Sequence, residues 1–214
     1  MRAFIYVGGS VDPKNITEHP KADDICIAAD VGAYNAKLLG DTPDFIVGDF
    51  DSLGFVPKGN NVITLPVKKD ITDMQSAVDI GIEKGFKTFV MYGGTGGRPD
   101  HTFANYALLC YIAKKGLRGY LVGEDYVVTS IHNSAITLPI RNNGTVSVFS
   151  AEGVSCGVSI TGLEYTLKDA SLSFDNPLGV SNSFIGEEGT VSVKNGTLLV
   201  MWQENNLKEF IDKL

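Results

Sequence analysis

The spacing of apolar residues changes near Asp125. Before this point short apolar runs alternate with stretches of helical period, whereas after it runs of strand length follow one another between turn residues. Alternating strands and helices are typical of an α/β domain with a mostly parallel sheet, and closely spaced strands are typical of an antiparallel sandwich. The sequence therefore predicts two domains, an α/β domain over residues 1–125 and a small antiparallel β-sandwich domain over residues 126–214.

The individual elements follow from the same periodicities. Six apolar runs in the first part predict strands buried on both faces, at residues 3–7, 25–29, 45–47, 62–65, 89–92 and 120–122. Apolar residues spaced three and four apart predict helices over 74–82 and 103–112. In the second part the expected strands cover 135–138, 145–149, 158–160, 170–174, 190–193 and 198–202, followed by a short amphipathic tail at 207–214.

Charge and cysteine content exclude several classes of protein. The net charge is −7 and Lys and Arg do not cluster, so the sequence lacks the broad basic surface that binds nucleic acid or an anionic membrane. The N-terminal apolar run is too short for a secretory signal, and no run is long enough to span a membrane. Cys26, Cys110 and Cys156 are odd in number and widely spaced, which disfavours a disulfide framework or a zinc site. We expect a cytoplasmic protein.

Acidic residues follow the predicted strands of the first part. Asp30 ends one strand, Asp49 and Asp51 of the GDFDS stretch end the next, and Asp70 and Asp73 lie where the following helix begins. If the strands run parallel, these acids gather at one edge of the sheet, where their mutual repulsion favours a bound cation. Oxygen ligands of this kind suit Mg²⁺ shared with substrate phosphates. Each Asp alone also suits a turn or a helix cap, and Thr72 with Gln75 fits a capping box.

A second cluster, GGTGGRPDH, lies between a predicted strand and the helix after it, from Gly93 to His101. Gly94, Gly96 and Gly97 allow backbone N–H groups to approach phosphate oxygens, and Arg98 supplies a planar fork for a phosphate. The stretch matches neither a P-loop nor a dinucleotide GxGxxG motif. With acids expected on the same edge, it predicts a polyphosphate site; His101 is equally compatible with a purely structural role.

These motifs occur together in one known family. The series AD-x-GA at 29–33, PDFIVGDFDS at 43–52, KDITD at 69–73, GGTGGRPDH at 93–101, GLEYTL at 162–167 and the Ser181-Asn182 pair resembles thiamine pyrophosphokinase, in order and in spacing. The resemblance covers nearly the whole chain. It implies an α/β catalytic domain, a β-sandwich domain, a homodimer with shared active sites, and Mg²⁺-dependent transfer of diphosphate from ATP to the hydroxyl of thiamine, with release of AMP.

The resemblance also assigns roles by position. It implies that Asp49, Asp51 and Asp73 bind the metal and, with Arg98 and Asp100, form the catalytic set. The same resemblance implies that the nucleotide is contacted by Asp30, Lys69, Asp70, Gly94, Gly96, Gly97, Arg98 and His101, and that thiamine is contacted by Ser181 and Asn182. An aromatic wall is expected for a flat aromatic cation, and Tyr165 or Trp202 could provide it, although both also suit a core. Val31 and Ser183 depart from the family pattern, which has Gly and an acidic residue there.

Three other functions fit parts of the pattern. A pyrophosphokinase for another heterocyclic alcohol, such as a hydroxymethylpterin, would use the same acids and glycine loop. A non-catalytic sensor of a nucleotide or vitamin would not need a complete acid set together with Arg98. A metal phosphoesterase fits less well, because no His-rich two-metal set accompanies the acids. The general base is left open between Asp70 and Asp100.

Overall fold

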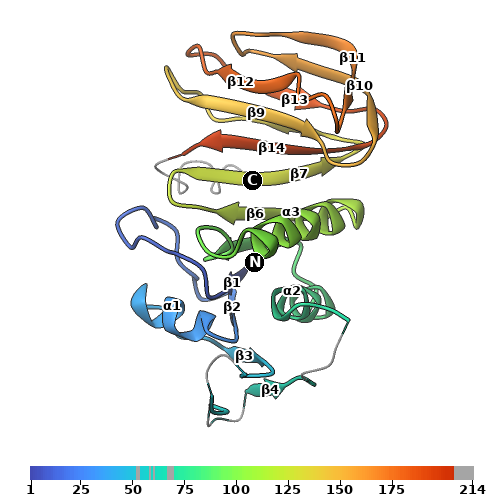
Figure 1. Cartoon of the computed structure of the whole chain (residues 1–214). Coiled ribbons are helices and arrows are strands. Elements are labelled where there is room, and N and C mark those ends of the chain that lie inside the picture. The colour runs from blue at the N-terminus through green and yellow to red at the C-terminus, as the bar shows by residue number, and fades with distance from the viewer. Residues whose placement is uncertain (52–53, 58, 60, 67–69, 205–214) are drawn as a thin grey trace. The chain divides into compact units, whose positions relative to one another are not determined.

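The computed structural model describes residues 1–51, 54–57, 59, 61–66 and 70–204 (Figure 1). Its elements are β1 (Ala3–Tyr6), β2 (Ile25–Ala29), α1 (Gly32–Leu38), β3 (Phe45–Gly48), β4 (Val62–Thr64), α2 (Asp73–Glu83), β5 (Thr88–Tyr92), α3 (Pro99–Lys114), β6 (Arg118–Val122), β7 (Tyr126–His132), β8 (Ala135–Thr137), β9 (Thr145–Ser150), β10 (Val154–Thr161), β11 (Leu167–Ser173), β12 (Gly179–Ser183), β13 (Thr190–Ser192) and β14 (Thr197–Gln203). The amphipathic tail expected at 207–214 lies outside the described residues.

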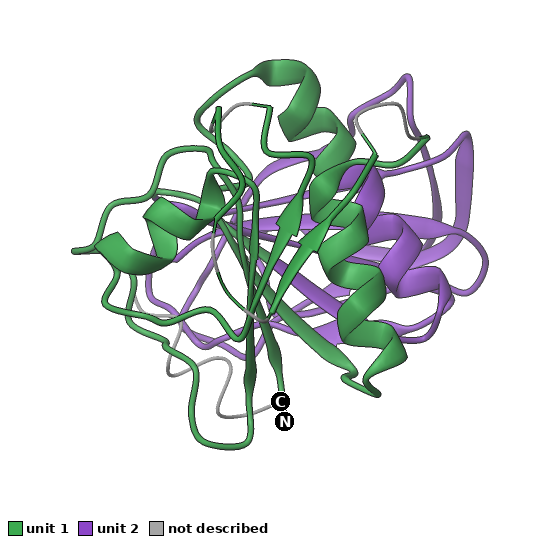
Figure 2. Cartoon of the chain, turned by 90° about the horizontal axis from the view of Figure 1, so that it is seen from below, with its two compact units in different colours: residues 1–105, 121–124 green, residues 106–120, 125–214 purple. Residues whose placement is uncertain are grey.

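The chain forms two compact units, shown in different colours in Figure 2. Unit 1 contains residues 1–105 and 121–124, and unit 2 contains residues 106–120 and 125–214. No helix in the described part of the chain is long and apolar enough to cross a membrane.

The strands of unit 1 are parallel, as expected, and lie in the order β5-β1-β2-β3-β4. β1, β2 and β5 carry almost only buried apolar residues, which is the pattern of strands covered on both faces. Helix α2 lies close against one face, where Gly81 leaves room for Phe89 and Ala3. Because the chain runs from β1 outward to β4 and then returns to place β5 on the other side of β1, the strand order reverses between β1 and β5.

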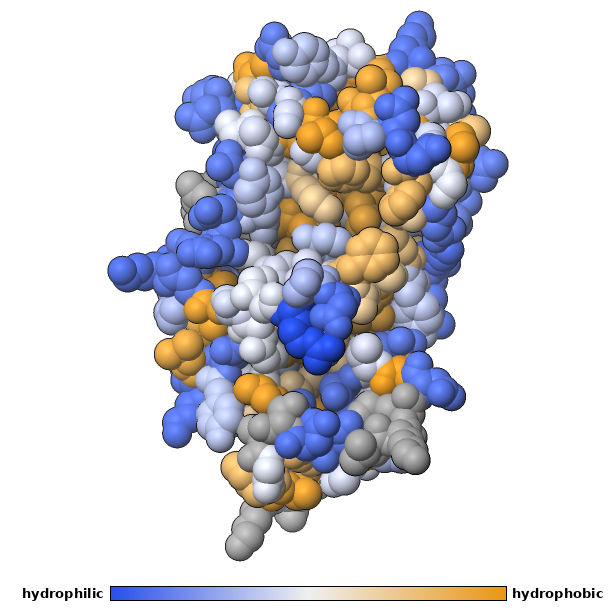
Figure 3. Space-filling model, viewed as in Figure 1, coloured by the Kyte–Doolittle hydropathy of each residue, from blue (hydrophilic) through white to orange (hydrophobic). Residues whose placement is uncertain are grey.

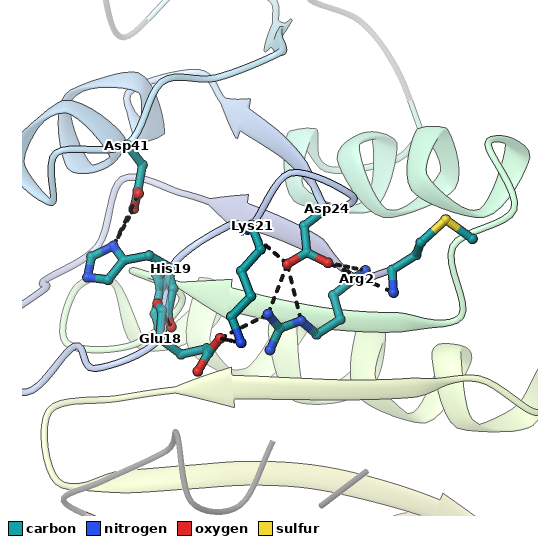
Figure 4. A network of polar contacts seen from close by, with 8 residues as sticks. Arg2, Glu18, His19, Lys21, Asp24 and Asp41 are labelled. Carbon is teal, nitrogen blue, oxygen red and sulfur yellow. Dashed lines mark hydrogen bonds and ion pairs between the residues drawn. The ribbon is translucent and has the colours of Figure 1, made fainter. Parts of the chain in front are cut away.

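A network of polar side chains fixes the segment between β1 and β2 (Figure 4). Arg2 pairs with Asp24 and with Glu18, and His19 contacts Asp41 at 3.0 Å. Glu18 is buried, and its charge is balanced by Arg2 and by Lys21 at 3.5 Å. The hydroxyl of Tyr6 donates to Asp41 at 2.6 Å; burial and this hydrogen bond raise the pKa of Tyr6, so the hydroxyl stays a donor. The segment is therefore held against the face that carries Tyr6.

Unit 2 contains a run of antiparallel strands, β12-β9-β14-β7, and a separate four-stranded antiparallel sheet, β11-β10-β13-β8. Alternate residues of β9 are buried, among them Val146 and Val148. The same alternation buries Val158 and Ile160 of β10. Such alternation marks sheets with one face in a common core. The predicted antiparallel sandwich is confirmed.

Three elements were not among those expected from the sequence. In β7 the apolar run is interrupted by Thr129 and Ser130. Both residues are buried, and their hydroxyls are satisfied there because they donate to Gly119 O and Leu198 O. β12 is polar, and its pairing with β9 is irregular between Gly179 and Asn182. α1 is short and begins without a side-chain cap. Hydrophobic periodicity cannot detect elements of these kinds.

Candidate active site

A cleft of about 640 Å³ opens in unit 1 beyond the carboxyl ends of the parallel strands. It is lined by residues that follow β1, β2, β3 and β5, and by the beginnings of α2 and α3. The crevice at the carboxyl ends of strands, where the strand order reverses, is the usual ligand site of an open α/β sheet. Its volume lies in the range of ligand pockets. The cleft is therefore the candidate active site.

Three of the predicted acids line this cleft: Asp30, Asp49 and Asp73. Asp30 follows β2 and Asp49 follows β3, and the two strand ends are joined where Asp30 N donates to Val47 O at 2.8 Å. Asp73 is the first residue of α2, and the backbone there is fixed because Thr72 Oγ1 accepts a hydrogen bond from Gln75 N at 3.1 Å. The predicted Thr72 cap is thus confirmed, and it coexists with a position for Asp73 in the cleft.

The other predicted acids lie differently. Asp51 is exposed and its backbone N–H donates to Asp49 Oδ1 at 3.3 Å, while buried Phe50 anchors the turn between them. Within the described residues, neither Asp51 nor Asp70 lines the cleft, and no three His, Cys, Asp or Glu side chains lie close enough together to hold a metal ion. Lys69 lies outside the described residues.

The glycine loop after β5 lies against the loop after β1. Gly9 N donates to Gly93 O at 2.7 Å and Ser10 N to Thr95 O at 3.2 Å. Gly94 and Gly97 line the cleft, whereas Gly96 is held by Ser10 Oγ, which donates to Gly96 O at 2.9 Å.

Arg98 directly precedes α3, and Asp100 and His101 lie in the first turn of this helix. Arg98 donates to Asp100 through Nε at 3.2 Å and Nη2 at 2.6 Å, and both side chains are exposed. These hydrogen bonds lower the pKa of Asp100 to about 2. Arg98 and His101 line the cleft. A carboxylate with so low a pKa is a weak base, which disfavours Asp100 as the general base.

The residues expected at thiamine belong to unit 2. Asn182 is 5% exposed, and its side chain accepts from Tyr165 N at 2.9 Å and from Ser183 N at 2.8 Å and donates to Tyr165 O at 2.6 Å. It therefore fixes the backbone of Tyr165, whose own side chain is 66% exposed. Ser181, with a φ of 62°, donates through its backbone N–H to Ser147 Oγ. Trp202 is fully buried in β14.

Sequence reasoning missed four residues that shape the cleft. Gly8 and Gly9 line it, and Asn35 of α1 donates to the loop that contains them. Asn105 of α3 is buried and donates to Gly94 O at 2.8 Å. The available signal was the Gly8-Gly9-Ser10 stretch directly after the first apolar run, because glycines at a strand end permit close approach of a ligand or of another backbone.

Comparison with known families shows to which family the chain belongs. Residues 17–121 match the family described as thiamin pyrophosphokinase, catalytic domain, and residues 134–198 match thiamin pyrophosphokinase, vitamin B1 binding domain. The chain belongs to the thiamin pyrophosphokinase family. The catalytic-domain match contains the acids and the glycine loop, and the binding-domain match contains Tyr165 and Asn182 but not Trp202.

Individual thiamin pyrophosphokinases align over nearly the whole chain. The thiamine pyrophosphokinase of Bacillus subtilis (strain 168) is 26% identical over 212 residues, which covers 94% of this chain and 98% of the relative. The crystal structure of the Geobacillus thermodenitrificans protein superimposes with a TM-score of 0.81 at 26% identity, over 95% of this chain and 98% of that one. The Candida albicans structure, at 15% identity and a TM-score of 0.73 over 95% and 89% of the two chains, shows the shared fold alone.

Proposed function

We propose that this chain transfers diphosphate from ATP to the hydroxyl of thiamine, giving thiamine diphosphate and AMP. The observation that carries the proposal is the cleft beyond the carboxyl ends of the strands, where three carboxylates, a glycine loop and Arg98 line one cavity in a chain with both thiamin pyrophosphokinase domains. A cleft lined by both acidic and basic groups suits a polyphosphate with a bound cation.

We propose Mg²⁺ as the cation, held by Asp49, Asp51 and Asp73 with Asp30 nearby. The donor set fits this ion, because Asp49 and Asp73 line the cleft and Mg²⁺ in proteins commonly takes one or two carboxylates and completes its shell with waters and substrate phosphates. The described residues form no cluster of three acidic side chains, and binding of this kind does not require one. When bound, the ion would neutralise the charge of the triphosphate.

The protein's own groups have separate tasks. Two N–H groups of Arg98 are engaged by Asp100, and a guanidinium has five, so the remaining donors can meet a phosphate while Asp100 fixes the plane of the fork. The N–H groups of the glycine loop and the helix start at Pro99 favour negative charge as the bond to AMP breaks. Lys69, Asp70, Gly96 and His101 remain proposed nucleotide contacts.

For thiamine we propose Tyr165 as the aromatic wall. Its ring is exposed while its backbone is fixed, whereas Trp202 is buried in the core of the β domain. Ser181 and Asn182 remain proposed members of the thiamine site, in a domain that we place at residues 126–214, after a catalytic domain of residues 1–125.

We further propose a homodimer whose active sites are shared between subunits. Apolar side chains reach the surface of the described part of the chain, as the orange areas of Figure 3 illustrate for one face. In unit 2, Phe174, Leu178, Val180 and Ile185 are each at least 42% exposed within a short stretch of chain. Such exposure suits an interface. The free cysteines support a cytoplasmic location, where thiols stay reduced.

The decisive experiment is incubation of the protein with ATP, Mg²⁺ and a panel of alcohols that includes thiamine and a hydroxymethylpterin. We expect AMP to accumulate only with thiamine and Mg²⁺ together, and the product mass to show an added diphosphate. ADP as product, or full activity in excess chelator, would contradict the proposal. Turnover of the pterin alone would identify the other pyrophosphokinase, and nucleotide binding without any AMP would identify a sensor.

A further inference from the structure

The loop after β1 is held from two sides. On one side its N–H groups donate to the glycine loop, from Gly9 to Gly93 O and from Ser10 to Thr95 O. On the other side its carbonyl groups accept from a single side chain, because Asn35 Nδ2 donates to Val7 O at 2.6 Å and to Gly9 O at 2.8 Å. Both protons of the Asn35 amide are thereby used within one short loop.

At Gly9 the contact between the two loops leaves no space for a side chain. A Cβ at Gly9 would lie 2.2 Å from Gly93 O and 2.6 Å from Thr95 O. The two backbones therefore touch directly, so a movement of the β1 loop toward the glycine loop would displace the glycine loop. Helix α1 is placed equally tightly, since a Cβ at Gly32 would lie 1.9 Å from Tyr6 O. This approach brings Asn35, one turn later in α1, to the carbonyls of the β1 loop.

The direction of the hydrogen bonds has a consequence for the cleft. In a trans peptide the C=O of one residue and the N–H of the next point in opposite directions. The carbonyls of Gly93, Thr95 and Gly96 are turned toward the β1 loop, so the N–H groups of Gly94, Gly96 and Gly97 point away from it. Gly94 and Gly97 line the cleft. The β1 loop thus sets the direction of these three amides, two of which belong to residues that line the cleft, where N–H groups can meet an anion.

We propose that Asn35 is a positioning residue of the nucleotide site, which fixes the β1 loop so that this loop and the glycine loop form one cradle for the phosphates of ATP. The inference rests on the proposed function for the identity of the nucleotide. It extends the site to residues 7–10, which precede the family match at residues 17–121. Asn35 acts through the loop and needs no contact with the substrate.

The test uses the full-length protein with Asn35→Asp and Asn35→Ala. The Asp variant keeps the shape but places a carboxylate against two carbonyls, and the Ala variant removes the donors without repulsion. Lys37→Ala, an exposed residue of the same helix, serves as the matched control. For each protein, the dissociation constant of a non-hydrolysable ATP analogue is measured by calorimetry, together with the KM values for ATP and thiamine and the melting temperature.

We expect both Asn35 variants to weaken binding of the analogue and to raise the KM for ATP by about 10-fold or more, because two carbonyls lose their donors. The KM for thiamine should stay within about twofold of the wild-type value. Unchanged analogue binding in folded variants would overturn the inference. An equal rise of the KM values for ATP and thiamine would do the same, and so would a loss of analogue binding that merely parallels a fall in melting temperature. If the wild-type protein makes no AMP but binds the analogue in an Asn35-dependent way, the proposed function fails and the positioning role stands.

Discussion

Asp49, Asp51 and Asp73 are suited both to turns and to a metal, and single substitutions separate the two roles. Replacement of each by Asn keeps the shape and removes the charge, so we expect the fold to persist and turnover to fall by about 100-fold or more. Activity per folded molecule and the melting temperature are measured for each variant. Asp23→Asn, at an exposed position in unit 1, is the control. Lower melting temperatures with undiminished activity would show that these acids serve only as caps and turn formers.

The ion pair between Arg98 and Asp100 predicts a pH dependence. Because hydrogen bonds from Arg98 lower the pKa of Asp100 to about 2, the carboxylate is charged throughout the neutral range. Since the folded pKa is below the ordinary value of about 4, the pair's contribution to stability is fully present above about pH 4 and is lost as the pH falls toward 2. NMR titration of the Asp100 carboxyl carbon should show this low midpoint, and Arg98→Gln should return it toward the ordinary value. A midpoint near 4 in the wild-type protein would contradict the pairing.

At the scale of elements, the position of α1 depends on the absence of a side chain at Gly32. A Cβ there would meet Tyr6 O at 1.9 Å and Val7 Cα at 2.8 Å, so Gly32→Ala must displace the helix or the end of β1. We expect a loss of about 1–3 kcal/mol in the free energy of unfolding, as for other overpacked sites. Urea denaturation measures it, and Lys37→Ala should change the same quantity by less than about 0.5 kcal/mol. Equal stability of the Gly32 variant and wild type would show that α1 adapts freely.

The elements also show what sequence periodicity can and cannot predict. β2 was expected over 25–29 and lies there, because its residues are apolar throughout and buried on both faces. The parallel-strand rule then placed Asp30 and Asp49 at one edge, where the cleft is found. The partnership of the two loops was not predictable, since Ser10 and Gly96 are 86 positions apart and no local pattern links them. The role of Asn35 could not be predicted either, because it depends on where α1 packs and not on the neighbours of Asn35 in the chain.

At the scale of the whole molecule, the proposed dimer joins two features that belong to different units. The acids and the glycine loop lie in unit 1, and Asn182 and Tyr165 lie in unit 2. In a two-fold dimer with shared sites, each site would combine the first domain of one chain with the second domain of the other. The arrangement predicts that two different inactive chains can restore activity to one another.

Complementation tests this sharing with Asp49→Asn and Asn182→Ala. Each variant is first shown to be folded and nearly inactive as a homodimer, and the two are then refolded together in equal amounts. In a mixed dimer with shared sites both lesions fall in one site and the other site is intact, so random pairing should leave roughly a quarter of all sites working. If each site belonged to a single chain, every site in the mixture would carry one lesion. Abundant mixed dimers in native mass spectrometry with activity no higher than that of the parents would therefore rule out shared sites.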